Sequence, residues 1–267
     1  MGTVILHTLR EAVFRRMGLV LLIISLLLPA LYVWGFRFET QADGSVMVRS
    51  GPRVLPAEVF VPYDLKRQLE QANVLWLVLG IFATAPLLTS YLEKGWAELL
   101  LSRGVPRWKM LLARYLGAWL LFCISLLLAY GLPAMYLWAG TGYRPGRFFL
   151  GLALTALNFG AVLAMMAPVG VAQSNPALLI IAGFIQVTVS RVLVDRESVY
   201  ALLNLRWPRP LMDAAYRILP KTWELGRMAS GIVDARPVES WWPFWTTVVF
   251  GALMLALAAE LLHRKSI

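Results

Sequence analysis

The chain has few of the residues from which metal sites and disulfides are built. Of its 267 residues only Cys123 is a cysteine, so an intramolecular disulfide and a cysteine metal cluster are excluded. The two histidines, His7 and His263, lie near opposite ends of the sequence and belong to no metal-binding motif. We therefore expect no metal site.

Catalytic motifs are lacking as well. The sequence has no HExxH, no GxSxG and no GxxxxGK[ST], so it offers no zinc protease helix, no nucleophile elbow and no phosphate-binding loop. These absences argue against an intramembrane enzyme. We expect the chain not to be an enzyme and to hold no cofactor of its own.

Charged residues are also scarce, at 15% of the chain, against 59% apolar residues and a mean hydropathy of +0.67. One soluble core cannot hide that much apolar surface, which favours a bilayer. A spanning helix needs about 20 mostly apolar residues. Six segments fit this length: 18–36, 74–92, 110–138, 148–171, 177–194 and 244–262. The third has room to tilt or to bend at Pro133. Acidic residues are missing from the interiors of all six, unlike most proton-driven transporters.

Basic residues predict the orientation. Arg15 and Arg16 precede the first span, and Arg264 and Lys265 follow the last, so the positive-inside rule places both termini in the cytoplasm. The first span has no small-residue cleavage pattern and is expected to be retained rather than removed as a signal peptide. We expect a multi-pass protein of a bacterial plasma membrane.

The formal charge of +10 could suggest nucleic acid, but the basic residues lie at predicted membrane boundaries. There they set the topology and meet anionic lipid head groups. No basic face with interleaved aromatic residues forms a compact module. We expect membrane lipids, and no nucleic acid, as partners.

A charged, amphipathic insert separates the second and third spans, from Leu92 to Lys109. Trp96 and the leucines at 99–101 supply an apolar stripe that can lie on the bilayer surface. Gly104 and Pro106 would end a helix before the third span begins. The insert is a candidate lever that a soluble cytoplasmic partner pushes. The alternative is an interfacial helix that only anchors the loop.

Six spans, an amphipathic segment at His7 to Met17 and the pattern E-x-G-x-x-E-L-L-L-S-x-x-V-P-R together resemble the permease subunits of type-2 ABC transporters. The pattern begins at Glu93. In that family this loop forms a coupling helix that docks on a separate ATPase subunit. The resemblance implies an ATPase interface at Glu93, Gly95, Glu98, Leu99, Ser102, Arg103, Pro106 and Arg107.

The resemblance also implies partners. Two permeases, either identical or homologous, would assemble with two cytoplasmic ATPase subunits, and ATP and Mg would bind to those subunits. The segment His7 to Met17 would lie flat before the first span, either as a second cytoplasmic contact or as a simple positive anchor.

Two amides stand out at membrane depth, Asn158 in the fourth span and Gln186 in the fifth. They are candidates for a translocation path, although an interhelical hydrogen bond is the commoner role of such amides. Between the last two spans, 195–243 predicts short outer helices, one of them capped by Thr222 with Glu224 in its first turn. Segment 37–70 is expected to be a further outer loop.

These observations predict an all-α integral membrane protein with one domain over residues 1–267. It has six transmembrane helices, an N-terminal amphipathic helix, a cytoplasmic coupling helix and short extracytoplasmic helices before the last span. The expected function is that of an ABC exporter permease that couples ATP hydrolysis by its partner to translocation. The alternative is a membrane scaffold that recruits a cytoplasmic factor without transport.

Overall fold

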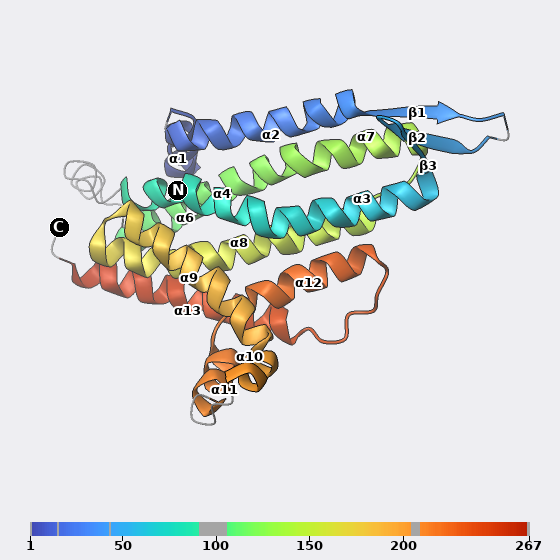
Figure 1. The fold of residues 1–267 in the computed structure, drawn as a ribbon. Coiled ribbons are helices and arrows are strands. Elements are labelled where there is room, and N and C mark those ends of the chain that lie inside the picture. The colour runs from blue at the N-terminus through green and yellow to red at the C-terminus, as the bar shows by residue number, and fades with distance from the viewer. Residues whose placement is uncertain (1, 15, 43, 91–105, 204–208, 266–267) are drawn as a thin grey trace.

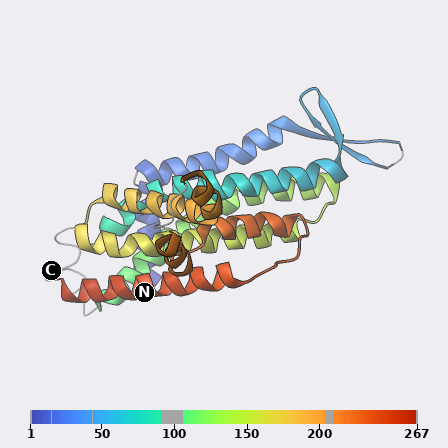
Figure 2. The ribbon, with the colours of Figure 1, turned by 60° about the horizontal axis from the view of Figure 1, so that its bottom comes forward.

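A computed structural model describes residues 2–14, 16–42, 44–90, 106–203 and 209–265. It is an elongated, mostly helical bundle with a small sheet at one end and both chain termini toward the other (Figures 1 and 2). We call these the sheet end and the terminal end.

Six helical stretches are long and apolar enough to cross a membrane: Arg16–Gly35, Ala57–Thr89, Arg107–Thr141, Gly146–Gln173, Pro176–Val194 and Trp242–Arg264. The elements within them are α2 (Arg16–Gly35), α3 (Ala57–Gln71), η1 (Ala72–Trp76), α4 (Leu77–Thr89), α6 (Arg107–Leu126), η3 (Leu127–Gly131), α7 (Leu132–Thr141), α8 (Gly146–Gln173), α9 (Pro176–Val194) and α13 (Trp242–Arg264). The six predicted spans therefore each have a matching helical stretch.

The second stretch differs from its prediction. It begins at Ala57 rather than at residue 74, because α3, η1 and α4 form one continuous helical stretch of 33 residues. At 1.5 Å per residue this helix is about 50 Å long, more than a hydrocarbon core of about 30 Å. The charged part, α3, packs beside α7, α8 and α12 (Thr222–Val233). The helix thus carries acidic side chains that the shorter predicted span left outside.

Two short π-helical turns interrupt the long helices at η1 and η3. The second ends at Gly131, two residues before Pro133, where a bend was expected. Trp76 of η1 and Tyr130 of η3 meet edge to face with ring centroids 5.4 Å apart. The two interruptions therefore lie side by side in the bundle.

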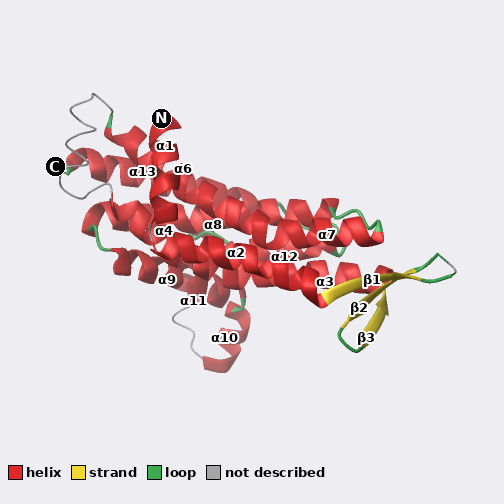
Figure 3. Ribbon diagram, turned by 90° about the horizontal axis from the view of Figure 1, so that it is seen from above, coloured by secondary structure: helices red, strands yellow, loops and turns green. Residues whose placement is uncertain are grey.

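The prediction of an all-α fold is wrong at the sheet end. Residues 36–56, which overlap the predicted loop 37–70, form a three-stranded antiparallel sheet (Figure 3). Its strands are β1 (Phe36–Thr40), β2 (Val46–Ser50) and β3 (Arg53–Pro56), in the order β1-β2-β3. Phe36 pairs with Ser50, and Met47 pairs with Pro56. A two-residue turn begins at Gly51, whose φ of 57° glycine adopts without strain.

Helix α1 (Gly2–Phe14) precedes α2 and lies across the bundle near the terminal end (Figure 3). It packs against α6, α2 and α4. Three helices follow α9: α10 (Arg196–Leu203), α11 (Arg209–Ile218) and α12. Short helices before the last span were predicted, and the side of the membrane on which they lie remains a prediction.

The core lies between α4, α6 and α8, whose facing side chains are buried. Phe122 and Phe159 stack there with centroids 3.8 Å apart, against Gly80 of α4. Helices α2, α9 and α13 leave large apolar side chains exposed, as suits helices that face lipid or a second membrane subunit.

Candidate functional site

Most of the predicted coupling helix lies in 91–105, outside the described residues. This applies to Glu93, Gly95, Glu98, Leu99, Ser102 and Arg103. Of the predicted ATPase interface, Pro106 and Arg107 are described. Pro106 precedes the first residue of α6 in an extended conformation (φ −65°, ψ 141°). That it ends a helix of the insert stays a prediction.

Arg107 joins the start of α6 to the end of α13. Its Nη1 donates hydrogen bonds to the carbonyl oxygens of Leu262 (3.3 Å), His263 (3.3 Å) and Lys265 (2.6 Å). The last carbonyls of a helix have no partner within the helix and form the negative end of its dipole. The guanidinium of Arg107 supplies both a hydrogen-bond donor for these carbonyls and a positive charge at the negative end of the dipole. Arg107 therefore fixes the C-terminal side of the insert to α13.

Arg114, about two turns further along α6, similarly joins α6 to α1 and to the end of α4. Its side chain is 2% exposed, and its Nη1 pairs with the carboxylate of Glu11 in α1. The same nitrogen donates to the hydroxyl of Ser90, 3.3 Å away, directly after α4. We call Arg107, Arg114, Glu11 and Ser90 the terminal junction. It ties both flanks of the insert to α1 and α13.

The two amides singled out in the sequence bind the backbone of one turn, 220–223, at the start of α12. Asn158 Nδ2 donates to the carbonyl of Thr222 (2.9 Å), and Gln186 Nε2 donates to the carbonyl of Pro220 (3.3 Å). Both side chains are buried. The structure thus assigns each amide a hydrogen bond to the backbone at the start of α12, and a place in a translocation path stays a prediction.

Two hydroxyls complete the anchoring of this turn. Thr247 of α13 accepts a hydrogen bond from the amide N–H of Lys221 (3.1 Å), and Ser190 of α9 accepts one from Trp223 (3.0 Å). Buried backbone groups need such partners. Side chains from three spanning helices therefore hold the turn from which α12 starts.

The predicted cap of α12 is wrong in detail. The helix begins at Thr222, Lys221 occupies the cap position, and no side-chain cap hydrogen bond forms there. The hydroxyl of Thr222 is buried without a hydrogen-bond partner among the described residues. Glu224 does lie in the first turn, where it accepts a hydrogen bond from the hydroxyl of Tyr216.

Lys221 is a buried cation, which the sequence analysis missed. Its side chain is 3% exposed, and its Nζ lies 3.2 Å from the ring centroid of Tyr216 without a hydrogen-bond partner among the described residues. Burial lowers the pKa of Lys221. Burial also raises the pKa of Tyr216, and the hydrogen bond with Glu224 raises it further. The ring partly compensates the buried charge, because ammonium groups are attracted to aromatic faces.

Replacing Lys221 by Met is expected to raise the free energy of unfolding by about 1–2 kcal/mol at neutral pH, because it removes a buried charge at similar volume. The advantage should shrink as pH rises, since the folded lysine loses its proton at a lower pH than the unfolded one and the wild type gains stability in that interval. Thermal denaturation at pH 7 and pH 10 measures both effects. A destabilised variant, or an advantage independent of pH, would contradict this reading.

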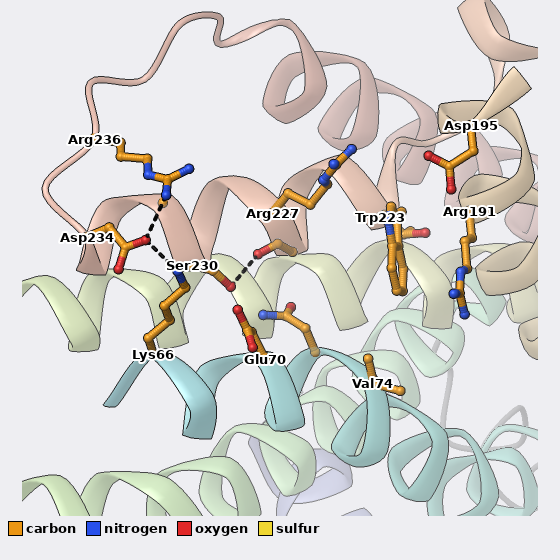
Figure 4. A pocket seen from close by; sticks show the side chains of 14 residues that line it. Lys66, Glu70, Val74, Arg191, Asp195, Trp223, Arg227, Ser230, Asp234 and Arg236 are labelled. Carbon is orange, nitrogen blue, oxygen red and sulfur yellow. Dashed lines mark hydrogen bonds and ion pairs between the residues drawn. The ribbon is translucent and has the colours of Figure 1, made fainter. Parts of the chain in front are cut away.

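A cavity of about 560 Å³ lies between α3, the end of α9 and α12 (Figure 4). Lys66 pairs with Asp234 at 2.7 Å, and Arg236 approaches the same carboxylate at 3.5 Å. Arg191 stacks on Trp223 with 4.9 Å to the ring centroid. Both charge signs line this cleft, which we call the charged cleft. Such a lining suits a polar, charged ligand.

In the described part of the chain, no group of three or more His, Cys, Asp or Glu side chains lies close enough together to hold a metal ion. No protein-family model matches the chain, and a search of curated proteins finds no match either.

Proposed function

We propose that the chain is the permease subunit of an ABC exporter, in which ATP-driven closure of two cytoplasmic ATPase subunits alternately exposes a path formed by two permeases. The second permease is another copy or a homologous chain. ATP and Mg bind to the ATPase subunits. The chain supplies the membrane path and the surface that receives the force.

The terminal junction is the observation that carries this proposal. A lever works only if its base is firmly joined to the parts that it moves. The flanks of the insert are joined to α1 through the buried pair of Arg114 and Glu11 and to α13 through Arg107. A force applied to residues 91–105 would therefore reach four helices, α1, α4, α6 and α13, rather than one loop.

The six candidate spans support the same proposal. The exposed apolar faces of α2, α9 and α13 leave surface for lipid and for a second permease. With the terminal junction in the cytoplasm, the sheet and the charged cleft lie toward the outer side of a bacterial plasma membrane. A scaffold that recruits a cytoplasmic factor would use the same insert, so the bound partner separates the two functions.

The first test is to purify the tagged chain from its native membrane in mild detergent and identify the retained proteins by mass spectrometry. An ATPase subunit in a one-to-one ratio supports the proposal. Reproducible retention of a protein that is not an ATPase, with no ATPase present, would favour the scaffold.

Charge reversal by Glu98→Arg tests coupling in the assembled complex. We expect it to abolish most transport in reconstituted vesicles while membrane insertion and ATP hydrolysis persist, because the resemblance places Glu98 at the ATPase interface. Glu239→Arg is the matched control, since Glu239 is exposed between α12 and α13. Unchanged coupling in the Glu98→Arg variant would reject the interface.

A further inference from the structure

A second cavity, of about 430 Å³, lies between α2, the α3–η1 segment and η3. Its volume falls within the range of about 300–1,000 Å³ that small-molecule sites occupy. Apolar surface dominates the lining. This cavity, which we call the amphiphile pocket, is separate from the charged cleft and from the terminal junction.

The lining changes character along the pocket. Asp64 and Gln68 of α3 lie at the level of Tyr32, near the sheet end of α2. Ile24 and Leu28 line the part nearer the middle of α2, since they lie about two turns and one turn, respectively, before Tyr32. A polar end and an apolar end in one cavity match an amphiphilic ligand, with the head toward the sheet end.

Two buried acceptors lie at the polar end. Asp64 is 7% exposed, and its Oδ2 accepts hydrogen bonds from the hydroxyl of Tyr32 and from Gln68 Nε2, the latter at 2.6 Å. Among the described residues Asp64 has no ion-pair partner within 4.0 Å. Gln68 is 6% exposed, and its Oε1 accepts no hydrogen bond from the described residues. A ligand with a hydrogen-bond donor, preferably a cationic one, would stabilise both the buried carboxylate of Asp64 and the free carbonyl oxygen of Gln68.

The two π-helical turns form the wall opposite α2. Leu75 and Trp76 come from η1, and Ala129 and Tyr130 come from η3. The indole N–H of Trp76 donates to the hydroxyl of Ser125 at 3.1 Å, which fixes the ring. Single π-helical turns are frequent at functional sites, because they redirect side chains out of the helical register. Here two of them contribute side chains to the same cavity.

We propose that the amphiphile pocket binds a single-chain amphiphile with a primary ammonium head group. The ammonium, with three donors, would bind Asp64 and the Oε1 of Gln68, and the alkyl chain would lie along Leu28, Leu75 and Trp76. Arg67 also lines this cavity, but its side chain is exposed, whereas Asp64 is buried. A carboxylate head group placed at the buried end would therefore face the charge of Asp64 and bind less tightly than an ammonium. The inference rests on the cavity alone and does not require the proposed transport function.

Native mass spectrometry of the purified full chain in detergent tests the proposal, with dodecylamine as the probe and dodecanoate as an anionic probe of equal chain length. We expect saturable binding of one dodecylamine and at least about tenfold weaker binding of dodecanoate, because the buried carboxylate of Asp64 accepts charge-assisted hydrogen bonds from an ammonium and repels a carboxylate. Equal binding of the two probes would overturn the proposal.

Three variants locate the site. Asp64→Asn should weaken dodecylamine binding by about tenfold or more, since the ion pair is lost and the hydrogen bond from Tyr32 can remain. Leu75→Trp should weaken it by narrowing the cavity, and Leu75 is 56% exposed, so the larger ring need not disturb folding. Glu70→Gln removes a carboxylate from the same helix but lines the charged cleft, so it should bind like the wild type.

The variants also guard against a folding artefact. Melting temperatures close to that of the wild type are required before affinities are compared. If Asp64→Asn fails to fold, the affinity of Leu75→Trp for dodecylamine is the test of the pocket. Undiminished binding in Leu75→Trp, or equal losses in Asp64→Asn and Glu70→Gln, would place the amine elsewhere and reject the pocket.

Discussion

Replacing Glu11 by Gln is expected to lower the free energy of unfolding by about 3 kcal/mol. The change removes the carboxylate of Glu11 from the charge of Arg114, a side chain that is 2% exposed. Removing one partner of a buried ion pair costs about 3–5 kcal/mol, and the partial exposure of Glu11 favours the lower end. Denaturant titration in detergent measures the difference.

Glu260→Gln is the matched control for this prediction. Glu260 pairs with Arg264 at 2.6 Å, but the two side chains are 52% and 76% exposed. Exposed pairs contribute about 0–1 kcal/mol, so this variant should remain close to the wild type. Similar losses in the two variants would mean that the terminal junction is no stronger than a surface contact.

Replacing Gly80 by Val is the second change for which we expect a large effect, a loss of about 3 kcal/mol in the free energy of unfolding. A Cβ at position 80 would lie 2.6 Å from a ring carbon of Phe122 and 2.7 Å from one of Phe159. The two stacked rings are fully buried between α6 and α8, so a shift of either ring would disturb the packing around it. Thermal denaturation and the recovery of folded protein measure the loss.

Gly231→Val controls for glycine replacement itself. Gly231 is also helical, in α12, but a Cβ there would have no atom within 4 Å. Valine has a somewhat higher helix propensity than glycine, so we expect a change within about 0.5 kcal/mol. Comparable destabilisation of both variants would show that backbone freedom, rather than the fit of α4 against the rings, governs position 80.

The spans could be predicted because hydropathy over about 20 residues decides membrane insertion almost alone. The extension of the second stretch to Ala57 could not, because Glu58, Asp64 and Lys66 make this segment polar on average. A helical signal was present in Val61, Leu65, Leu69 and Trp76, which are buried and recur every three to four residues or a multiple. Periodicity would have found α3 where mean hydropathy did not.

The sheet escaped prediction for a different reason. Its strands are four or five residues long, and only Val48 of the middle strand is fully buried. Alternation over so few residues is a weak signal. The turn at Gly51 and Pro52 was the clearest mark of a hairpin.

The candidate site was foreseen in part. Asn158 and Gln186 were recognisable because amides at membrane depth must find a partner. That both would hold the turn 220–223 could not be predicted, since its partners are backbone carbonyls far away in sequence. Arg107 was named through a family motif, yet its bond to the end of α13 depends on tertiary packing alone.

One helix forms a wall of two cavities. Asp64 and Gln68 face the amphiphile pocket, and Lys66 and Glu70 face the charged cleft, so at 3.6 residues per turn the cavities adjoin opposite sides of α3. A lateral shift of α3 that widens one cavity narrows the other. Ligands of the two cavities would then oppose each other through thermodynamic linkage, each weakening the other by the same factor without contact between them.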